Sequence, residues 1–92
     1  MSEYKNYLKR LKVIIKREKP LDMDHFLDKL SEKDLITTVE EKELKERSTY
    51  KHKVDGVYFI LNQKDAKSTF YDVERILEEM ERCDIIAEMM KR

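Results

Sequence analysis

The stretch Val54-Asp55-Gly56-Val57-Tyr58-Phe59-Ile60-Leu61 is the densest apolar run of the 92-residue chain, and it contains the only glycine. Its β-branched and aromatic residues would suit a buried strand. No second strand candidate is present to pair with it, and a lone strand leaves its backbone hydrogen bonds unmade. We therefore predict a helix over about residues 49–62, capped by Ser48 or Thr49. Its apolar stripe comprises Tyr50, Val54, Val57 and Leu61.

Gly56 lies in the interior of this predicted helix. Glycine there is less favourable than alanine by about 1 kcal/mol, because its backbone loses more conformational freedom on folding. The usual reason to keep such a glycine is a neighbouring helix that comes too close for a side chain. We therefore expect another helix to pack directly against position 56.

The composition of the whole chain predicts an all-α protein. One glycine, one proline and 43% charged residues are typical of chains built from helix formers. The length supports a single domain, residues 1–92, with one modest core. One cysteine excludes an intrachain disulfide and fits a reducing compartment, so we expect a cytoplasmic protein. No apolar run approaches the ~20 residues that span a bilayer, so we expect no membrane partner.

The first two helices are separated by the only proline, Pro20. Apolar residues recur at helical spacing through residues 3–19, and Pro20 ends this helix because its ring cannot continue the hydrogen-bond ladder. The second helix begins near Asp22 or Asp24, since either carboxylate can cap it and oppose the helix dipole.

A third helix is predicted over about residues 38–47. Two overlapping capping boxes precede it, each a threonine followed three residues later by a glutamate: Thr37 with Glu40, and Thr38 with Glu41. The segment has little apolar content, so we expect it to be the most exposed and least stable helix.

The last third of the chain contains one or two helices. A fifth helix begins between residues 66 and 69, and Asp84 could cap a short sixth helix. No glycine or proline forces a break between the two, so a merged helix stays open. Together the segments predict an antiparallel six-helix bundle with a core that includes Leu11, Phe26, Leu30, Val54, Leu61 and Leu77.

Charge is segregated along the chain although the net charge is zero. Residues 1–20 carry seven bases and two acids, a net of +5, whereas residues 21–46 carry four bases and nine acids, a net of −5. Residues 47–67 follow with five bases and two acids (+3), and residues 68–92 with four bases and seven acids (−3). A compact fold of such a chain could present one basic face and one acidic face.

The sequence has no recognisable catalytic or metal-binding pattern. Cys83, His25 and His52 lie at unrelated spacings, and no local signature links them as nucleophile and base or as zinc ligands. We interpret Cys83 as a small apolar residue beside the sixth helix, His25 as a residue at the edge of the core and His52 as solvated. A glycine-rich phosphate loop is absent. We therefore predict no enzyme, no catalytic residue, no metal and no cofactor.

A small helical nucleic-acid-binding protein is an alternative. The basic first helix and the segment Lys51-His52-Lys53 could contact phosphates. The acidic block at residues 21–46 would repel the same phosphates, and a net charge of zero gives little long-range attraction. We therefore expect no nucleic-acid partner.

The run Phe26-Leu27-Asp28-Lys29-Leu30-Ser31-Glu32-Lys33-Asp34-Leu35-Ile36-Thr37 resembles the second helix and following turn of caspase recruitment domains. In those domains a leucine-rich helix and a charged turn lead, through a leucine/isoleucine–threonine step, into an acidic third helix. Further similarities cover their fourth helix (Thr49, Lys51, Val54, Val57, Leu61), the start of the fifth (Lys64, Asp65, Phe70, Val73, Leu77) and the sixth (Ile85-Ile86-Ala87-Glu88-Met89). The chain is most similar to the prodomains of initiator caspases and to the adaptors that recruit them.

The resemblance implies a six-helix Greek-key bundle of the death-fold superfamily that acts in apoptotic or inflammatory signalling without catalysis. Such domains bind another domain of the same kind, in a caspase or an adaptor, and the resemblance leaves self-association and filaments open. They commonly dock a basic face of helices one and four against an acidic face of helices two and three. The corresponding basic residues here are Lys12, Arg17 and Lys51, and the acidic ones are Asp28, Glu40 and Glu41.

Two features depart from the family pattern. Asp55 stands one turn after Lys51, where some relatives repeat a basic residue, and Lys53 would replace that charge only if it points the same way. The usual glycine between helices four and five is replaced by Gln63-Lys64-Asp65-Ala66. A death-effector or pyrin-type domain is a further alternative, although the Arg-x-Asp-Leu motif usual in the last helix of death-effector domains is absent.

Overall fold

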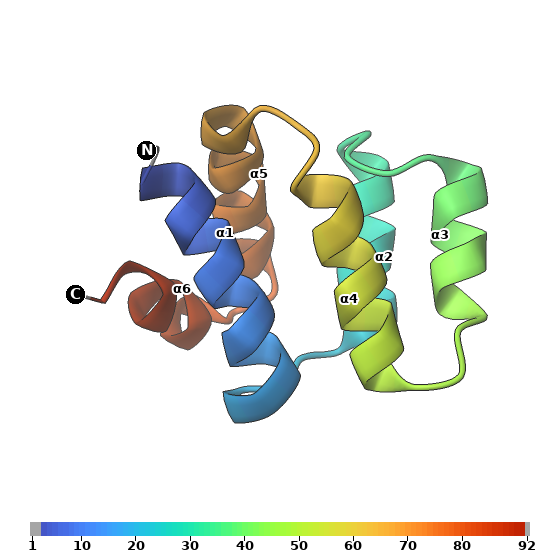
Figure 1. Ribbon diagram of the computed structural model, residues 1–92, viewed down its shortest axis with the longest axis horizontal. Coiled ribbons are helices and arrows are strands. Elements are labelled where there is room, and N and C mark those ends of the chain that lie inside the picture. The colour runs from blue at the N-terminus through green and yellow to red at the C-terminus, as the bar shows by residue number, and fades with distance from the viewer. Residues whose placement is uncertain (1–2, 92) are drawn as a thin grey trace.

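In the computed structural model, which describes residues 3–91, the protein is all-α: this range holds six α-helices and no strand (Figure 1). The elements are α1 (Glu3–Val13), a π-helical turn η1 (Ile14–Glu18), α2 (Met23–Glu32), α3 (Thr38–Lys45), α4 (Tyr50–Leu61), α5 (Ala66–Glu79) and α6 (Cys83–Met90). In Figure 1 the direction alternates from α1 to α5, with α1, α3 and α5 running downward and α2 and α4 upward. None of the described helices is long and apolar enough to cross a bilayer.

The core lies between α1, α2, α4 and α5. Helix α1 packs against α4, α5 and α6, and α2 packs against α3, α4 and α5. The six residues predicted to be buried are all buried: Leu11, Phe26, Leu30, Val54, Leu61 and Leu77. Helical spacing of apolar residues therefore identified the inward side of each of these helices.

The first helix changes form after Val13. The predicted helix over residues 3–19 is α-helical only to Val13 and closes with the wider turn η1, which buries Ile14 and Ile15. Tyr50 of α4 donates its hydroxyl hydrogen to the Ile15 carbonyl and accepts a hydrogen bond from the Leu21 N–H at 3.1 Å. One side chain of α4 therefore holds both sides of the turn that leads into α2.

Side-chain caps start α2 and α3. The Asp22 carboxylate accepts a hydrogen bond from the His25 N–H at 3.2 Å, so the first of the two candidate residues caps α2. Thr37 and Glu40 form a complete capping box, in which the Thr37 hydroxyl accepts from the Glu40 N–H at 3.0 Å and the Glu40 carboxylate accepts from the Thr37 N–H at 2.8 Å. Thr38 is already inside α3, so the second candidate box is not used.

The close approach expected at Gly56 is present, and the neighbour is α3. A Cβ placed on Gly56 would lie 2.3 Å from Cδ2 of Leu44 and 2.9 Å from Nη1 of Arg47. Leu44 is the one buried residue of α3. The predicted exposure of the third helix is therefore confirmed, and its attachment depends on Leu44 lying over a residue without a side chain.

Helices α5 and α6 are separate. Glu81 has a φ of 60°, in the left-handed region that ends a helix, and α6 starts two residues later at Cys83. Asp84 lies in the first turn of α6 and does not cap it; its carboxylate instead accepts a hydrogen bond from Nε of Arg82 at 3.1 Å. Arg82 also donates to the Pro20 carbonyl at 2.9 Å, which ties this turn to the α1–α2 connection.

Candidate functional site

A stripe of lysines runs along α1 and into η1, and its last two members, Lys12 and Lys16, face α4. Lys5, Lys9, Lys12 and Lys16 recur at intervals of four, three and four residues, so they share one side of the helix. The Lys12 ammonium lies 5.0 Å from the centre of the Tyr58 ring, and Lys16 Nζ lies 2.7 Å from Asp55 Oδ1, which directs this side toward α4.

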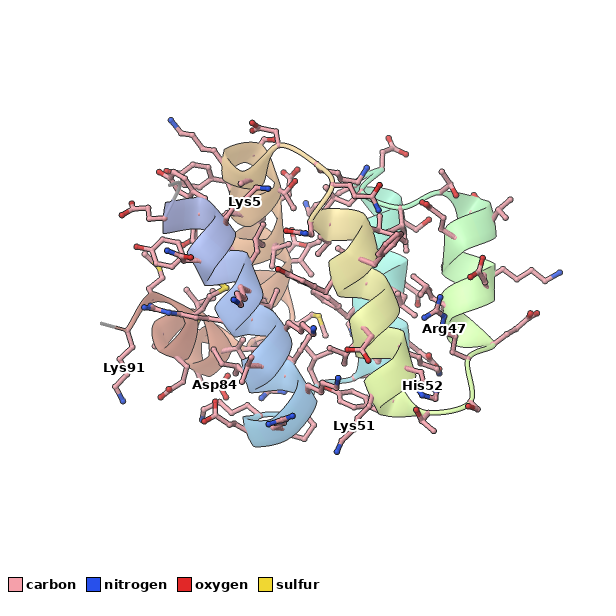
Figure 2. All side chains as sticks on the ribbon, in the orientation of Figure 1. Lys5, Arg47, Lys51, His52, Asp84 and Lys91 are labelled. Atoms are coloured by element: carbon pink, nitrogen blue, oxygen red, sulfur yellow. The ribbon has the colours of Figure 1, made fainter. Side chains whose placement is uncertain are left out.

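Two more cations border the stripe. Arg17 is exposed in η1, and Lys51 is exposed in the first turn of α4. Figure 2 shows Lys5 near the start of α1 and Lys51 near the start of α4. We call these six cations the lysine face: Lys5, Lys9, Lys12, Lys16, Arg17 and Lys51. Of the three predicted basic residues, Lys12 lies over Tyr58 of α4 and Lys51 lies in the first turn of α4 on the same side of the bundle, whereas Arg17 is exposed in η1.

Asp55 does not interrupt the lysine face with a free negative charge. The hydrogen bond from Lys16 holds the pKa of the Asp55 carboxyl below its usual range. Lys53 is not part of this face, because its Nζ lies 3.3 Å from Asp24 Oδ1 on α2. The condition under which Lys53 could replace a basic residue at position 55, that it points the same way, is therefore not met, because Lys53 is directed to α2 and Asp55 to Lys16 of η1.

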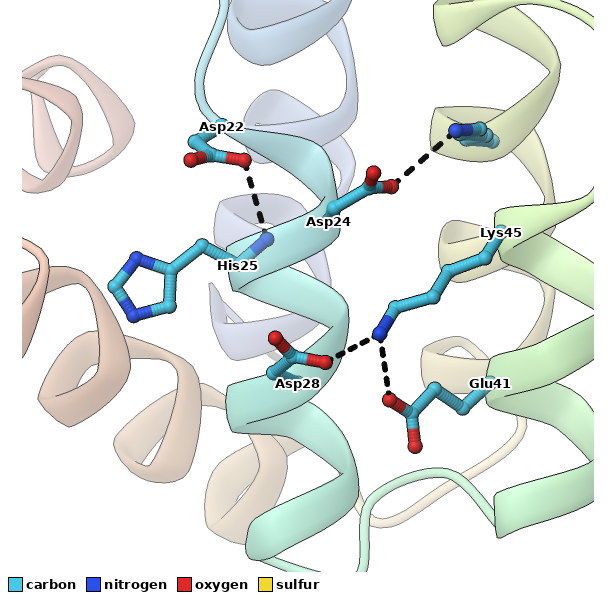
Figure 3. Close-up of polar contacts among 7 residues, drawn as sticks. Asp22, Asp24, His25, Asp28, Glu41 and Lys45 are labelled. Atoms are coloured by element: carbon cyan, nitrogen blue, oxygen red, sulfur yellow. Dashed lines mark hydrogen bonds and ion pairs between the residues drawn. The ribbon is translucent and has the colours of Figure 1, made fainter.

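The predicted acidic residues lie along α2 and α3. Lys45 Nζ donates hydrogen bonds both to the Asp28 carboxylate and to Glu41 Oε2, the latter at 2.9 Å (Figure 3). The contact with Lys45 lowers the pKa of Asp28, and the same contact raises the pKa of Lys45. Glu40 is held in the capping box at the start of α3. We call four of the six carboxylates on these helices, Asp24, Asp28, Glu40 and Glu41, the carboxylate face.

Lys29 of α2 and Lys33, which follows that helix, point away from the carboxylate face. Lys29 Nζ lies 3.4 Å and Lys33 Nζ 3.8 Å from the carboxylate of Glu79 on α5. Only Lys45 and Lys53 therefore offset the four carboxylates of this face through ion pairs among residues 3–91. The face keeps a net negative charge, but most of its carboxylates already have a cation of the same chain.

Cys83 and His25 are both exposed. Cys83 is the first residue of α6, beside which it was predicted, whereas His25 does not lie at the core edge as expected. His25 follows Met23, which is buried, and precedes Phe26, which is also buried, and the 100° step between helix residues turns it outward. His52 is exposed, as predicted. Among residues 3–91, no three His, Cys, Asp or Glu side chains converge as metal ligands would.

Sequence reasoning missed several members of these faces. The spacing of Lys5, Lys9 and Lys16 relative to Lys12 was a readable signal, because it is the spacing of one helix side. The pair Glu41–Lys45 was also readable, as an i, i+4 pair. The bond from Lys45 to Asp28 spans 17 residues and had no local signal.

No protein-family model, curated protein or solved structure matches the chain. The candidate site consists of exposed cations on α1, η1 and α4, and carboxylates on α2 and α3. Helices α1 and α3 lie on opposite sides of α4 (Figure 1).

Proposed function

We propose that the protein is a homotypic interaction module of the caspase-recruitment type, which docks its lysine face on the carboxylate face of a second such domain. The partner is another copy of the chain or a similar domain of a caspase or adaptor, and the setting is apoptotic or inflammatory signalling. The packing order supports a Greek-key death fold, because α1 adjoins α4, α5 and α6 while α2 adjoins α3 and α5. The alternating direction of successive helices is consistent with it (Figure 1).

The observation that carries the proposal is the set of cations without partners on the lysine face. Lys5, Lys9, Arg17 and Lys51 are exposed and form no ion pair within residues 3–91. Such a concentration of one sign on a chain of zero net charge favours an anionic partner surface. The same chain carries a suitable surface in its own carboxylate face.

Docking of this kind would be heterologous. Because the two faces lie at different ends of the bundle, one molecule can use both at once and propagate a head-to-tail assembly. Each exposed ion pair contributes only ~0.2–1 kcal/mol, so several must act together. We therefore expect weak association that salt screens, with electrostatic attraction acting mainly on the association rate.

The test is reversal of the lysine face. The double variant Arg17→Glu with Lys51→Glu should weaken association by about tenfold or more, measured by sedimentation at low and physiological salt. The matched control is Lys64→Glu with Lys67→Glu, which makes the same charge change at exposed positions between α4 and the first turn of α5. Equal association of the wild type and the Arg17/Lys51 variant would reject electrostatic docking.

The reciprocal variant removes the carboxylate face. Asp28→Asn with Glu41→Gln should weaken association in the same way, because it leaves Lys45 without its two carboxylates. Mixing this variant with the Arg17/Lys51 variant should restore a one-to-one complex, since each molecule keeps one native face. Failure of the mixture to associate would contradict pairing of these two faces.

A nucleic-acid oligonucleotide serves as the alternative ligand in the same titrations. We expect duplex DNA and RNA to bind no more tightly than the nonspecific level at physiological salt. Submicromolar binding of a defined oligonucleotide, lost in the Arg17/Lys51 variant, would instead assign the lysine face to nucleic acid.

A further inference from the structure

The peptide carbonyl of Ile15 has neither of its usual helical donors. In an α-helix it would accept a hydrogen bond from the N–H of residue 19, but the Lys19 N–H instead binds the Ile14 carbonyl at 2.8 Å, which closes the wide turn η1. In a π-helix the donor would be residue 20, which is a proline and has no N–H. A donor from another part of the chain must therefore satisfy the Ile15 carbonyl.

The hydroxyl of Tyr50 supplies this donor. It donates to the Ile15 carbonyl and accepts a hydrogen bond from the N–H of Leu21 at 3.1 Å. Leu21 is the residue directly after Pro20, so one hydroxyl binds the backbone on both sides of the proline. Burial raises the pKa of the Tyr50 hydroxyl, so the group stays protonated and able to donate at neutral pH.

The turn held by Tyr50 carries two cations of the lysine face. Lys16 and Arg17 belong to η1, whereas Lys51 lies in the first turn of α4, directly after Tyr50. A second contact between η1 and α4 is the ion pair of Lys16 Nζ with Asp55 Oδ1 at 2.7 Å. Both side chains of this pair are partly exposed, and such pairs are weak. The ion pair therefore follows the position of the turn, and the hydrogen bonds of Tyr50 to the backbone set that position.

We propose that Tyr50 is a positioning residue of the lysine face: its hydroxyl takes the place of the N–H that Pro20 lacks and fixes the η1 cations relative to Lys51. The inference rests on the proposed function only in that this surface is the one that docks. Tyr50 acts through the η1 backbone and touches no partner. A surface whose cations are held in place loses less conformational freedom on docking, so it binds more tightly than a mobile one.

The variant Tyr50→Phe tests the positioning role, because it keeps the ring and removes the hydroxyl. The Leu21 amide hydrogen should exchange about tenfold faster or more, since its acceptor is lost. The pKa of the Asp55 carboxyl should rise toward its ordinary value, since the turn that carries Lys16 is released. Tyr58→Phe is the matched control: it removes a hydroxyl two turns further along α4 and should change neither quantity.

A rescue variant separates the proposed role from a general loss of packing. Pro20→Ala restores an N–H at position 20, from which the Ile15 carbonyl can accept. In that background Tyr50→Phe should shift the Asp55 pKa less than it does in the wild type, and the four species form a double-mutant cycle. An Asp55 pKa that does not move in Tyr50→Phe, or that moves equally in both backgrounds, overturns the positioning role.

Docking provides an independent readout. Tyr50→Phe should raise the dissociation constant for self-association by about threefold to tenfold. Arg17→Gln should weaken association less in the Tyr50→Phe background than in the wild type, because the position of Arg17 is already lost. Lys5→Gln, at the other end of α1, should weaken association equally in both backgrounds.

The two sets of measurements distinguish failure of this inference from failure of the proposed function. Amide exchange and the Asp55 pKa need no association, so they decide whether Tyr50 fixes the turn even where the charge reversals reject docking. An unchanged dissociation constant in Tyr50→Phe, with the Arg17/Lys51 reversal still effective, would overturn the role of Tyr50 in docking and leave the docking of the charged faces standing.

Discussion

The lysine face and the carboxylate face differ in how far their charges are used inside the molecule. Lys5, Lys9, Arg17 and Lys51 are exposed without an ion pair within residues 3–91. On the carboxylate face Lys45 binds Asp28 and Glu41, and Lys53 binds Asp24. The carboxylate face comes from the block of net charge −5, and all of the lysine face except Lys51 comes from the block of net charge +5. A block of charge thus becomes an available surface only where the fold leaves its residues unpaired.

The two faces also differ in how firmly they are attached to the core. Helix α4, beside the lysine face, buries Val54, Gly56, Val57 and Leu61, whereas α3 buries only Leu44. Local opening requires less free energy where few apolar contacts are lost. The lysine face is therefore the rigid member of the pair, and the carboxylate face is the one whose position depends on a few residues.

The largest expected effect on stability comes from truncating Leu44, the buried residue that attaches α3 to the core. Leu44→Ala should lower the free energy of unfolding by about 2–5 kcal/mol, since Leu44 is buried against Gly56. The loss should be local, with amide hydrogens of α3 exchanging faster while those of α1 and α5 stay protected. Leu61→Ala is the matched variant on α4, and it should reduce protection throughout the bundle. Uniform loss of protection in Leu44→Ala would show that α3 is not the weaker attachment.

Filling the space beneath α3 should have the next largest effect. Gly56→Val should destabilise the fold by about 1–3 kcal/mol, because its Cβ alone would lie 2.3 Å from Leu44 Cδ2. The same substitution in a Leu44→Ala background should cost less, since the clashing atom is then absent. Denaturant unfolding of the four species of this double-mutant cycle measures the coupling. If the two substitutions change the free energy of unfolding additively, the clash caused by Gly56→Val is not with Leu44.

The cap of α3 comes third. Thr37→Ala should cost about 1 kcal/mol, because the Thr37 hydroxyl accepts the Glu40 N–H at the helix start. Thr38→Ala is the control one residue away, and it should have little effect because Thr38 lies inside α3 and takes no part in the cap. Thermal unfolding of the two variants compares them directly. Equal losses would mean that the second capping box operates in solution.

The smallest effect on stability should come from Lys45, and it depends on pH. The hydrogen bond from Lys45 lowers the pKa of Asp28 in the folded state, so its stabilisation is present above the unfolded pKa and disappears as pH falls through the folded pKa. Lys45→Gln should therefore raise the Asp28 pKa toward its ordinary value and destabilise the protein slightly at neutral pH but not in acid. Carboxyl NMR titration measures this shift.

Lys42→Gln is the control for that variant. Lys42 is exposed, lies one turn before Lys45 and forms no ion pair within residues 3–91. The Lys42→Gln variant makes the same change in net charge as Lys45→Gln and should leave the pKa of Asp28 as it is in the wild type. Because Lys45→Gln also frees two carboxylates, it should strengthen docking to a lysine face. An equal shift of the Asp28 pKa in both variants would mean that the net charge of the protein, and not the contact with Lys45, sets this pKa.

Local chemistry made the helices predictable. Pro20, the Thr37–Glu40 capping box and Thr49 act on neighbours within four residues, so their effects are visible in the sequence. Thr49, for example, accepts a hydrogen bond from the His52 N–H at 3.1 Å. The need for a close neighbour at Gly56 was also visible in the sequence, because glycine destabilises a helix interior and is kept there when a neighbouring helix leaves no room for a side chain. The identity of that neighbour was not.

The sequence by itself determined an all-α chain, the starts of α2 to α5 within a few residues and the inward side of the helices, because these depend on residues within one or two turns. Only the tertiary structure decided the π-helical turn after Val13, the left-handed Glu81 that separates α5 from α6, and the partners of the charged residues. Lys53 pairs with Asp24 of α2, and Lys45 of α3 pairs with Asp28 of α2. Ion pairing depends on which helices lie side by side, and the packing of the core sets that arrangement.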